Sequence, residues 1–230
     1  LHVRSRRQRQ MCIRDRAFDG DADRCFVVDE KGGIVDPSTL TALIATRELA
    51  KAPGSTIIHN LITSRAVPEI VIENGGTAVR TRVGHSFIKA TMAETGAIFG
   101  GEHSGHFYFR DFWKADSGML AAMHALAALG ETLESTTLSE LLKPYLRYAM
   151  SGEINTKVSD APAVIARIKE TAIKQGSELD ELDGLTVSGD SWWFNVRSSN
   201  TEPLLRLNVE AKDVANMEIV RDSVLSMMVG

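Results

Sequence analysis

Three aspartates stand at alternate positions near the start of the sequence: Asp19, Asp21 and Asp23. The small residues between them allow the backbone to curl, so the three carboxylates can converge on one cation. Carboxylate oxygens suit Mg²⁺, and the segment lacks the glycine and distal glutamate of an EF-hand calcium loop. The alternative, a solvated acidic turn, fits poorly with the apolar strand predicted directly after it. We therefore predict a Mg²⁺ site here, with the adjacent Arg24 suited to binding phosphate oxygens.

A second polar segment covers residues 100–106 and contains Glu102, Ser104 and His106. It follows a short apolar segment, and open α/β sheets bind their ligands at the carboxyl ends of such strands. Glu102 and Ser104 could accept from and donate to neighbouring hydroxyls of a sugar. His106 could act as an acid, a base or a ligand group, although a single histidine is also often structural. His85, at a predicted strand-to-helix turn, could contact an anion or cap the helix.

A third polar segment, residues 197–203, follows a predicted strand near the C-terminus. It combines an arginine with hydroxyl groups and a turn whose backbone N–H groups would be exposed. These groups together form the kind of nest that binds an anion, although an ordinary polar turn has a similar composition. The candidate residues are Arg197, Ser199, Asn200 and Thr201.

The elements that must position these segments follow two patterns. In the first part, short apolar strands alternate with helices, which predicts a parallel α/β sheet. The strands are expected at 25–29, 56–60, 77–82 and 97–99, and the helices at 39–50, 64–73, 84–95 and 116–129. After a helical link at 138–146, the pattern predicts a small α+β domain from about residue 148. Its strands are expected at 151–157, 185–187, 192–197 and 204–211, with helices at 161–174 and at the C-terminus.

The composition is that of an ordinary globular protein, with 43% hydrophobic and 24% charged residues among 230. The two cysteines form no disulfide or metal pattern, which favours a reducing, cytoplasmic location. There is no apolar run of the ~20 residues that a membrane helix needs, and no apolar stretch follows the basic N-terminus as in a secretory signal. Residues 1–16 carry six arginines but no interleaved aromatic residues, so we expect a non-native or disordered segment and no nucleic-acid partner.

The three polar segments, in this order, resemble the α-D-phosphohexomutase family of the phosphomannomutase/phosphoglucomutase type. The family forms are D-G-D-x-D-R, matched at residues 19–24, G-E-x-S-G-H at 101–106, and R-x-S-N-T-E-P at 197–203. Residues 81–89 are also similar to its third domain. The resemblance implies that residues 17–33 are the end of a second domain with the metal loop, 34–147 a sugar-binding third domain and 148–230 a phosphate-binding fourth domain. The charged residues 14–16 stand where the family has a small apolar strand, which suggests a junction between Arg16 and Ala17.

The resemblance also implies a role for each candidate residue. The three aspartates would bind Mg²⁺, and Arg24 and His106 would face the substrate and support catalysis. Glu102 and Ser104 would hold sugar hydroxyls, and His85 would face the substrate. The non-transferring phosphate would be held by Arg197, Ser199, Asn200 and Thr201.

Enzymes of this family interconvert hexose 1-phosphate and hexose 6-phosphate through a phosphoserine and a hexose 1,6-bisphosphate. The serine motif of the family, similar to T-A-S-H-N-P, is absent from this sequence. We therefore expect a C-terminal fragment without mutase activity of its own, whose partners are hexose phosphates of mannose or glucose. Three alternatives stay open: a non-catalytic sugar-phosphate binding module, a relative of phosphoglucosamine mutase, and a magnesium phosphatase with an aspartyl nucleophile. The sequence leaves the oligomeric state open.

Overall fold

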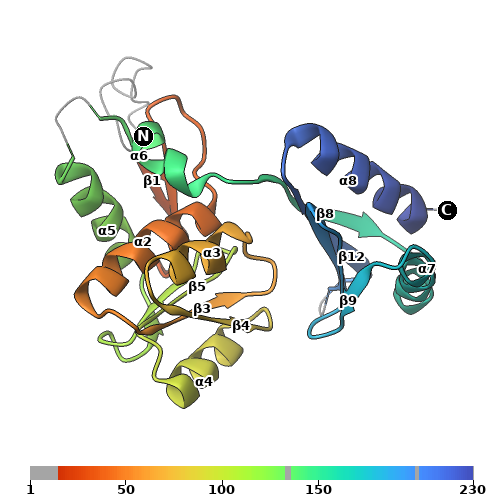
Figure 1. The fold of residues 1–230 in the computed structure, drawn as a ribbon, viewed down its shortest axis with the longest axis horizontal. Coiled ribbons are helices and arrows are strands. Elements are labelled where there is room, and N and C mark those ends of the chain that lie inside the picture. Colours follow the sequence, from red (N-terminus) through yellow and green to blue (C-terminus); the bar gives the residue numbers. More distant parts are fainter. Residues whose placement is uncertain (1–14, 133–135, 200–201, 230) are drawn as a thin grey trace. The chain divides into compact units, whose positions relative to one another are not determined.

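The computed structural model describes residues 15–132, 136–199 and 202–229. The chain divides into two compact units, the first ending at Leu146 and the second beginning at Arg147 (Figure 1). Each unit has its own sheet and its own hydrophobic core. Within the described residues, no helix is long and apolar enough to cross a membrane.

The main sheet of the first unit has five strands. Their order is β4 (Thr77–Thr81), β3 (Thr56–Asn60), β5 (Phe99–Gly101), β6 (Phe107–Phe109) and β7 (Ala115–Asp116). Strand β3 is parallel to β4 and β5, as predicted, whereas β6 and β7 extend the sheet in the antiparallel sense. The α/β class is confirmed, and the structure adds two short antiparallel strands to the predicted parallel sheet. Strands β6 and β7 are too short to produce a recognisable period in the sequence.

Helices lie on both sides of this sheet, with α4 on the side opposite to α2 and α3 (Figure 1). Ile88 and Met92 of α4 are fully buried and pack with Ile58 and Tyr108 from the strands. Asp36 and Ser117 cap the N-termini of α2 and α5 by accepting hydrogen bonds from backbone N–H groups. The helical elements are α2 (Pro37–Lys51), α3 (Ala66–Glu73), α4 (His85–Thr95), α5 (Gly118–Gly130), α6 (Leu138–Leu142) and the 3₁₀ helix η1 (Lys143–Tyr145).

A separate two-stranded ribbon carries the acidic loop. Strand β1 (Asp15–Phe18) pairs antiparallel with β2 (Cys25–Val28), so residues 19–24 form the connection between them. Strand β1 begins two residues before the junction proposed from the sequence. The side chains of Cys25 and Val27 are buried, which fixes the position of β2 against the first unit.

The second unit is a five-stranded antiparallel sheet with two helices. The strand order is β8 (Ala149–Lys157), β12 (Leu204–Ala211), β11 (Trp192–Ser198), β10 (Leu185–Ser188) and β9 (Glu178–Asp180). The helices are α7 (Ala161–Lys174) and α8 (Val214–Val229). This confirms the predicted α+β arrangement, to which the structure adds the short strand β9.

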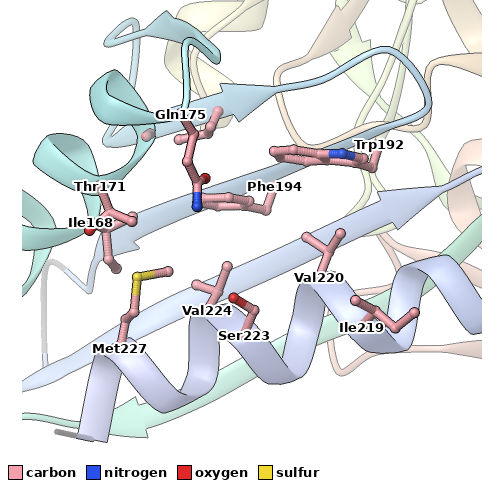
Figure 2. Close-up of a pocket in the computed structure, with 12 residues that line it drawn as sticks. Ile168, Thr171, Gln175, Trp192, Phe194, Ile219, Val220, Ser223, Val224 and Met227 are labelled. Carbon is pink, nitrogen blue, oxygen red and sulfur yellow. The ribbon is translucent and has the colours of Figure 1, made fainter.

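The two faces of this sheet differ in polarity. Leu205, Leu207 and Val209 belong to the core cluster that includes α7 and α8. A groove of about 200 Å³ lies between these helices, with Trp192 and Phe194 stacked on its floor (Figure 2). Because side chains alternate along a strand, the residues between these apolar positions lie on the opposite face. That opposite face is polar and carries the arginine predicted to bind phosphate.

Candidate functional site

The acidic loop brings its three aspartates together. Asp19, Asp21 and Asp23 each have a carboxylate oxygen within 4.8 Å of those of the other two. Ala22 adopts the left-handed conformation with φ of 62°, and its N–H donates to the carbonyl oxygen of Asp19 at 3.2 Å. This curl of the backbone is the geometry that a cation site at these residues requires.

Arg24 is paired with the first of these aspartates. Its Nε donates to Asp19 Oδ2 at 2.5 Å, and its backbone N–H donates to Oδ1 at 3.2 Å. Desolvation alone would raise the pKa of Asp19, but the two bonds from Arg24 outweigh it and lower the pKa. The same contact raises the pKa of Arg24. Asp19 is therefore an ionised carboxylate with a fixed orientation.

One carboxylate oxygen of Asp23 is buried without a hydrogen bond from the part of the chain that the structure describes. Its Oδ1 is buried and has no hydrogen-bond partner among the described residues, and the nearest cation, Arg24 Nε, is 3.8 Å away. Desolvation raises its pKa, His106 opposes this shift, and the charges of Asp19 and Asp21 add to it. A divalent cation would satisfy the orphaned oxygen and remove the repulsion between carboxylates. The oxygen donors present fit Mg²⁺ in number and type.

His106 connects the acidic loop to the second polar segment. Its Nε2 lies 3.6 Å from Asp23 Oδ2, and its Nδ1 lies 2.9 Å from Ser104 Oγ. The backbone N–H of Cys25 donates to Gly105 at 3.1 Å, which holds the two segments side by side. His106, Asp23 and Asp116 also offer ligand atoms within 4.8 Å of one another. The structure thus joins two segments that are separated in the sequence.

Glu102 is buried, with a side chain only 2% exposed. Its Oε2 accepts from the Tyr108 hydroxyl at 2.7 Å, and its Oε1 accepts from the Gly84 N–H at 3.1 Å and Asn60 Nδ2 at 3.3 Å. Burial, followed by the charge of Glu102, raises the pKa of Tyr108, which therefore stays protonated and donates. Contact of Glu102 with a sugar remains a prediction, because here the carboxylate is held by donors from the protein.

The third polar segment connects β11 to β12. Arg197 Nη2 lies 2.8 Å from Glu153 Oε2, and Arg206 Nη1 lies 3.2 Å from Glu153 Oε1. Arg206 Nη2 is also 3.5 Å from Ser199 Oγ. Burial lowers the pKa of Arg197, although the charge of Glu153 opposes that shift. Two further candidates, Asn200 and Thr201, lie outside the described residues.

Comparison with known families covers both units. The model of the phosphoglucomutase/phosphomannomutase alpha/beta/alpha domain III matches residues 36–148, and that of the C-terminal domain of the same enzymes matches residues 153–227. The chain belongs to the phosphoglucomutase/phosphomannomutase family. The acidic loop precedes the first matched domain, so its assignment depends on the geometry described above.

Individual relatives agree with this family. A phosphomannomutase from Methanocaldococcus jannaschii is 45% identical over 201 residues, covering 87% of this chain and 44% of the relative. A phosphoglucomutase/phosphomannomutase family protein from Burkholderia thailandensis has a TM-score of 0.80 at 32% identity, covering 92% of this chain and 45% of that one. The chain thus spans less than half the length of these relatives.

A more distant structure shows the fold alone. This is the N-acetylphosphoglucosamine mutase from Aspergillus fumigatus, with a TM-score of 0.66 at 15% identity. The match covers 93% of this chain and 52% of that one, which was solved in complex with GlcNAc-6P and magnesium.

Two supporting residues of the candidate site were missed by the sequence patterns. Asp116 pairs with Lys89 at 3.0 Å. Burial would raise the pKa of Asp116, but the contact with Lys89 outweighs it and lowers that pKa, so Asp116 is ionised. Gly118 begins α5 directly against the acidic loop, where an added Cβ would lie 2.6 Å from the Arg24 carbonyl oxygen. The polar run 115–118 before an apolar helix was a possible signal for both.

His85 takes a peripheral position in the candidate site. It is exposed at the first residue of α4, and no side-chain cap bond is made at that helix start. Its neighbour Gly84 donates to Glu102, which ties this end of α4 to the second polar segment. A substrate contact of His85 therefore stays a prediction.

Proposed function

We propose that this chain supplies the metal, sugar and phosphate sites of a phosphohexomutase that interconverts the 1- and 6-phosphates of mannose or glucose. The observation that carries the proposal is the convergence of the three aspartates beside Ser104 and His106. Family membership and the phosphomannomutase relatives support it. A cytoplasmic location stays a prediction from the cysteine content.

The acidic loop would hold the metal through Asp19, Asp21 and Asp23. When bound, Mg²⁺ supplies positive charge that stabilises a transferring phosphoryl group. Arg24 keeps Asp19 ionised and oriented, and its half-exposed guanidinium can turn to an incoming phosphate. The protein thus contributes position and charge, which account for most of the catalysis of phosphoryl transfer.

The second polar segment would bind the sugar. Ser104 can donate to or accept from a hydroxyl, and its contact with Nδ1 of His106 fixes the orientation of the imidazole. The other ring nitrogen, Nε2, faces Asp23 and can hold or release a proton there. Glu102 keeps the segment in place through its three donors and could accept a sugar hydroxyl through a remaining lone pair.

The third segment would hold the phosphate that is not transferred. Arg197 provides a planar pair of donors, and Ser199 provides a hydroxyl. Asn200 and Thr201 would complete the site, as the family motif implies. Since this sequence contains no T-A-S-H-N-P motif, we propose that turnover needs a phosphoserine from outside these 230 residues.

The test separates binding from turnover. A coupled assay should show no conversion of mannose 1-phosphate or glucose 1-phosphate above a metal-free blank, whereas calorimetry should show Mg²⁺-dependent binding of glucose 1,6-bisphosphate. Turnover by this chain alone would contradict the missing-serine part of the proposal. Absence of any sugar-phosphate binding would contradict the proposal as a whole. Adding glucosamine 1-phosphate to the titrations tests the phosphoglucosamine alternative.

The structure argues against a phosphatase with an aspartyl nucleophile. Asp19, the residue in the position of that nucleophile, has its Oδ2 bonded to Arg24 at 2.5 Å. A carboxylate held by a guanidinium is a weakened nucleophile because its charge is neutralised. A phosphatase activity that is abolished by Asp19→Asn and that exceeds the blank would revive this alternative.

A further inference from the structure

An ion-pair cluster spans three strands on the polar face of the second unit's sheet. Glu153 lies on β8, Arg206 on the adjacent β12 and Arg197 on β11. Each oxygen of the Glu153 carboxylate takes a different arginine, at 2.8 Å for Arg197 and 3.2 Å for Arg206. Arg206 also reaches Ser199, a residue of the proposed phosphate segment, at 3.5 Å.

The two arginines could not adopt this arrangement alone. Arg197 and Arg206 are direct cross-strand partners, and like charges in such a pair repel each other. The Arg197 side chain is only 13% exposed, so its charge is poorly solvated. Glu153 offsets both penalties because it lies between the two guanidinium groups.

The cluster retains the capacity to bind an anion. Two arginines and one glutamate leave one net positive charge. The Nε groups of both arginines are buried and have no hydrogen-bond partner among the described residues. A phosphate bound at this segment would therefore meet guanidinium groups that are already oriented by Glu153 and still carry a net positive charge.

We propose that Glu153 is a positioning residue of the phosphate site, which orients Arg197 directly and Ser199 through Arg206. The inference rests on the proposed role of residues 197–203 in binding phosphate. It makes a prediction opposite to that of simple electrostatics. An acidic residue beside an anion site should weaken binding through its charge, whereas a residue that preorganises the site strengthens binding.

The experiment compares variants of the full 230-residue chain in calorimetric or NMR titrations with glucose 1-phosphate and with inorganic phosphate. We expect Glu153→Gln to weaken both affinities about tenfold, because it releases two guanidinium groups from one orientation. Glu153→Asp should recover part of the loss. Glu170→Gln, which removes an exposed acid on α7 paired with Lys174, is the matched charge control and should change nothing.

Two further measurements separate positioning from a purely structural role. The Mg²⁺ affinity of the first unit is an internal control and should be the same in all variants. The unfolding temperature is measured in parallel, and titrations are made well below it. A residue that served only stability would lower the unfolding temperature and leave the phosphate affinity of the folded chain unchanged. If Glu153→Gln fails to fold, Arg206→Lys keeps the charge but loses the planar contact, and should also weaken phosphate binding.

The possible failures are distinguishable. If the unaltered chain binds no phosphate ligand, the proposed function of residues 197–203 is wrong and the inference fails with it. If the unaltered chain binds and Glu153→Gln binds equally well or more tightly, only the positioning role is overturned.

Discussion

The two candidate sites are built from opposite charges but share one design. The site of the first unit gathers the carboxylates Asp19, Asp21 and Asp23, and Arg24 is paired with the first of them. The site of the second unit gathers two arginines around one glutamate. In both, a residue of the minority charge is paired with oppositely charged neighbours: Arg24 with Asp19, and Glu153 with Arg197 and Arg206.

The sites differ in how complete they are. In the acidic site, the pKa of Asp23 is raised by burial and by neighbouring carboxylates, and its Oδ1 has no hydrogen-bond partner within the described part of the chain. In the basic site, the central carboxylate of Glu153 has a partner for each oxygen. We therefore expect the first site to need a cation to reach its stable form, and the second to be largely organised before a ligand arrives.

The largest expected effect follows from removing one ligand of the acidic site. Asp23→Asn should weaken Mg²⁺ binding about 100-fold, because it removes a negative charge and one of the two carboxylate oxygens. Calorimetric titration with MgCl₂ measures this. Asp111→Asn, an exposed aspartate paired with Arg110, is the control and should bind Mg²⁺ normally. An equal loss of inorganic phosphate binding in Asp23→Asn would contradict the assignment of that ligand to residues 197–203.

Two glycines, Gly118 and Gly184, allow each site to be perturbed without the other. An added Cβ at Gly118 would lie 2.6 Å from the Arg24 carbonyl oxygen, and one at Gly184 would lie 2.6 Å from the Arg197 Cβ. Each alanine variant should cost about 2 kcal/mol in the free energy of unfolding through overpacking. Gly118→Ala should also weaken Mg²⁺ binding and Gly184→Ala phosphate binding, each leaving the other ligand unaffected.

The control for both variants is Gly130→Ala at the end of α5, where an added Cβ meets no atom within 4 Å. Denaturant unfolding and the two titrations would be made for all three variants. A Gly118→Ala variant that binds Mg²⁺ as tightly as the unaltered chain would show that the loop does not depend on this close approach.

The stability of the two units should also depend differently on pH, because all six histidines lie in the first unit. Burial lowers the pKa of His59 to about 4. Its unfolded pKa is about 6.5, so below that pH the unfolded chain binds a proton that the folded chain excludes. The stability of the first unit should therefore fall from pH 6.5 towards 4, by up to about 1.4 kcal/mol per pH unit.

Hydrogen exchange of peptides from β3 and from β12 would follow the two units separately. We expect the loss of protection between pH 6.5 and 5 to be confined to β3 and to diminish in His59→Gln. The same loss in β12, which belongs to a unit without histidine, would contradict this assignment.

Local spacing predicted the convergence of the three aspartates, whereas long-range contacts limited what could be predicted elsewhere. The spacing of the three aspartates was sufficient because one turn of backbone brings them together. The burial of Glu102 could not be read from its neighbours, since its donors come from Asn60, Gly84 and Tyr108. The sequence also did not show which acid would stand beside Arg197, because Glu153 reaches it from β8.

The smallest expected effect tests whether the polar face depends on charge or on polarity in general. Asn208 lies on that face between Arg206 and Glu210, is 1% exposed, and both its side-chain polar atoms lack a hydrogen-bond partner among the described residues. Replacing an unsatisfied amide with an apolar group of similar size is nearly neutral or stabilising. Asn208→Leu should therefore change the free energy of unfolding by less than about 1 kcal/mol and leave phosphate binding intact.

Denaturant unfolding of Asn208→Leu would be compared with Asn155→Leu, which alters an exposed amide on β8 opposite Arg206. A loss well above that of Asn155→Leu would mean that the Asn208 amide has a partner, such as a buried water. In that case the neutral residues would help to support the polar face. The expected result would instead favour the ion pairs of Glu153 over the Asn208 amide in organising the phosphate site.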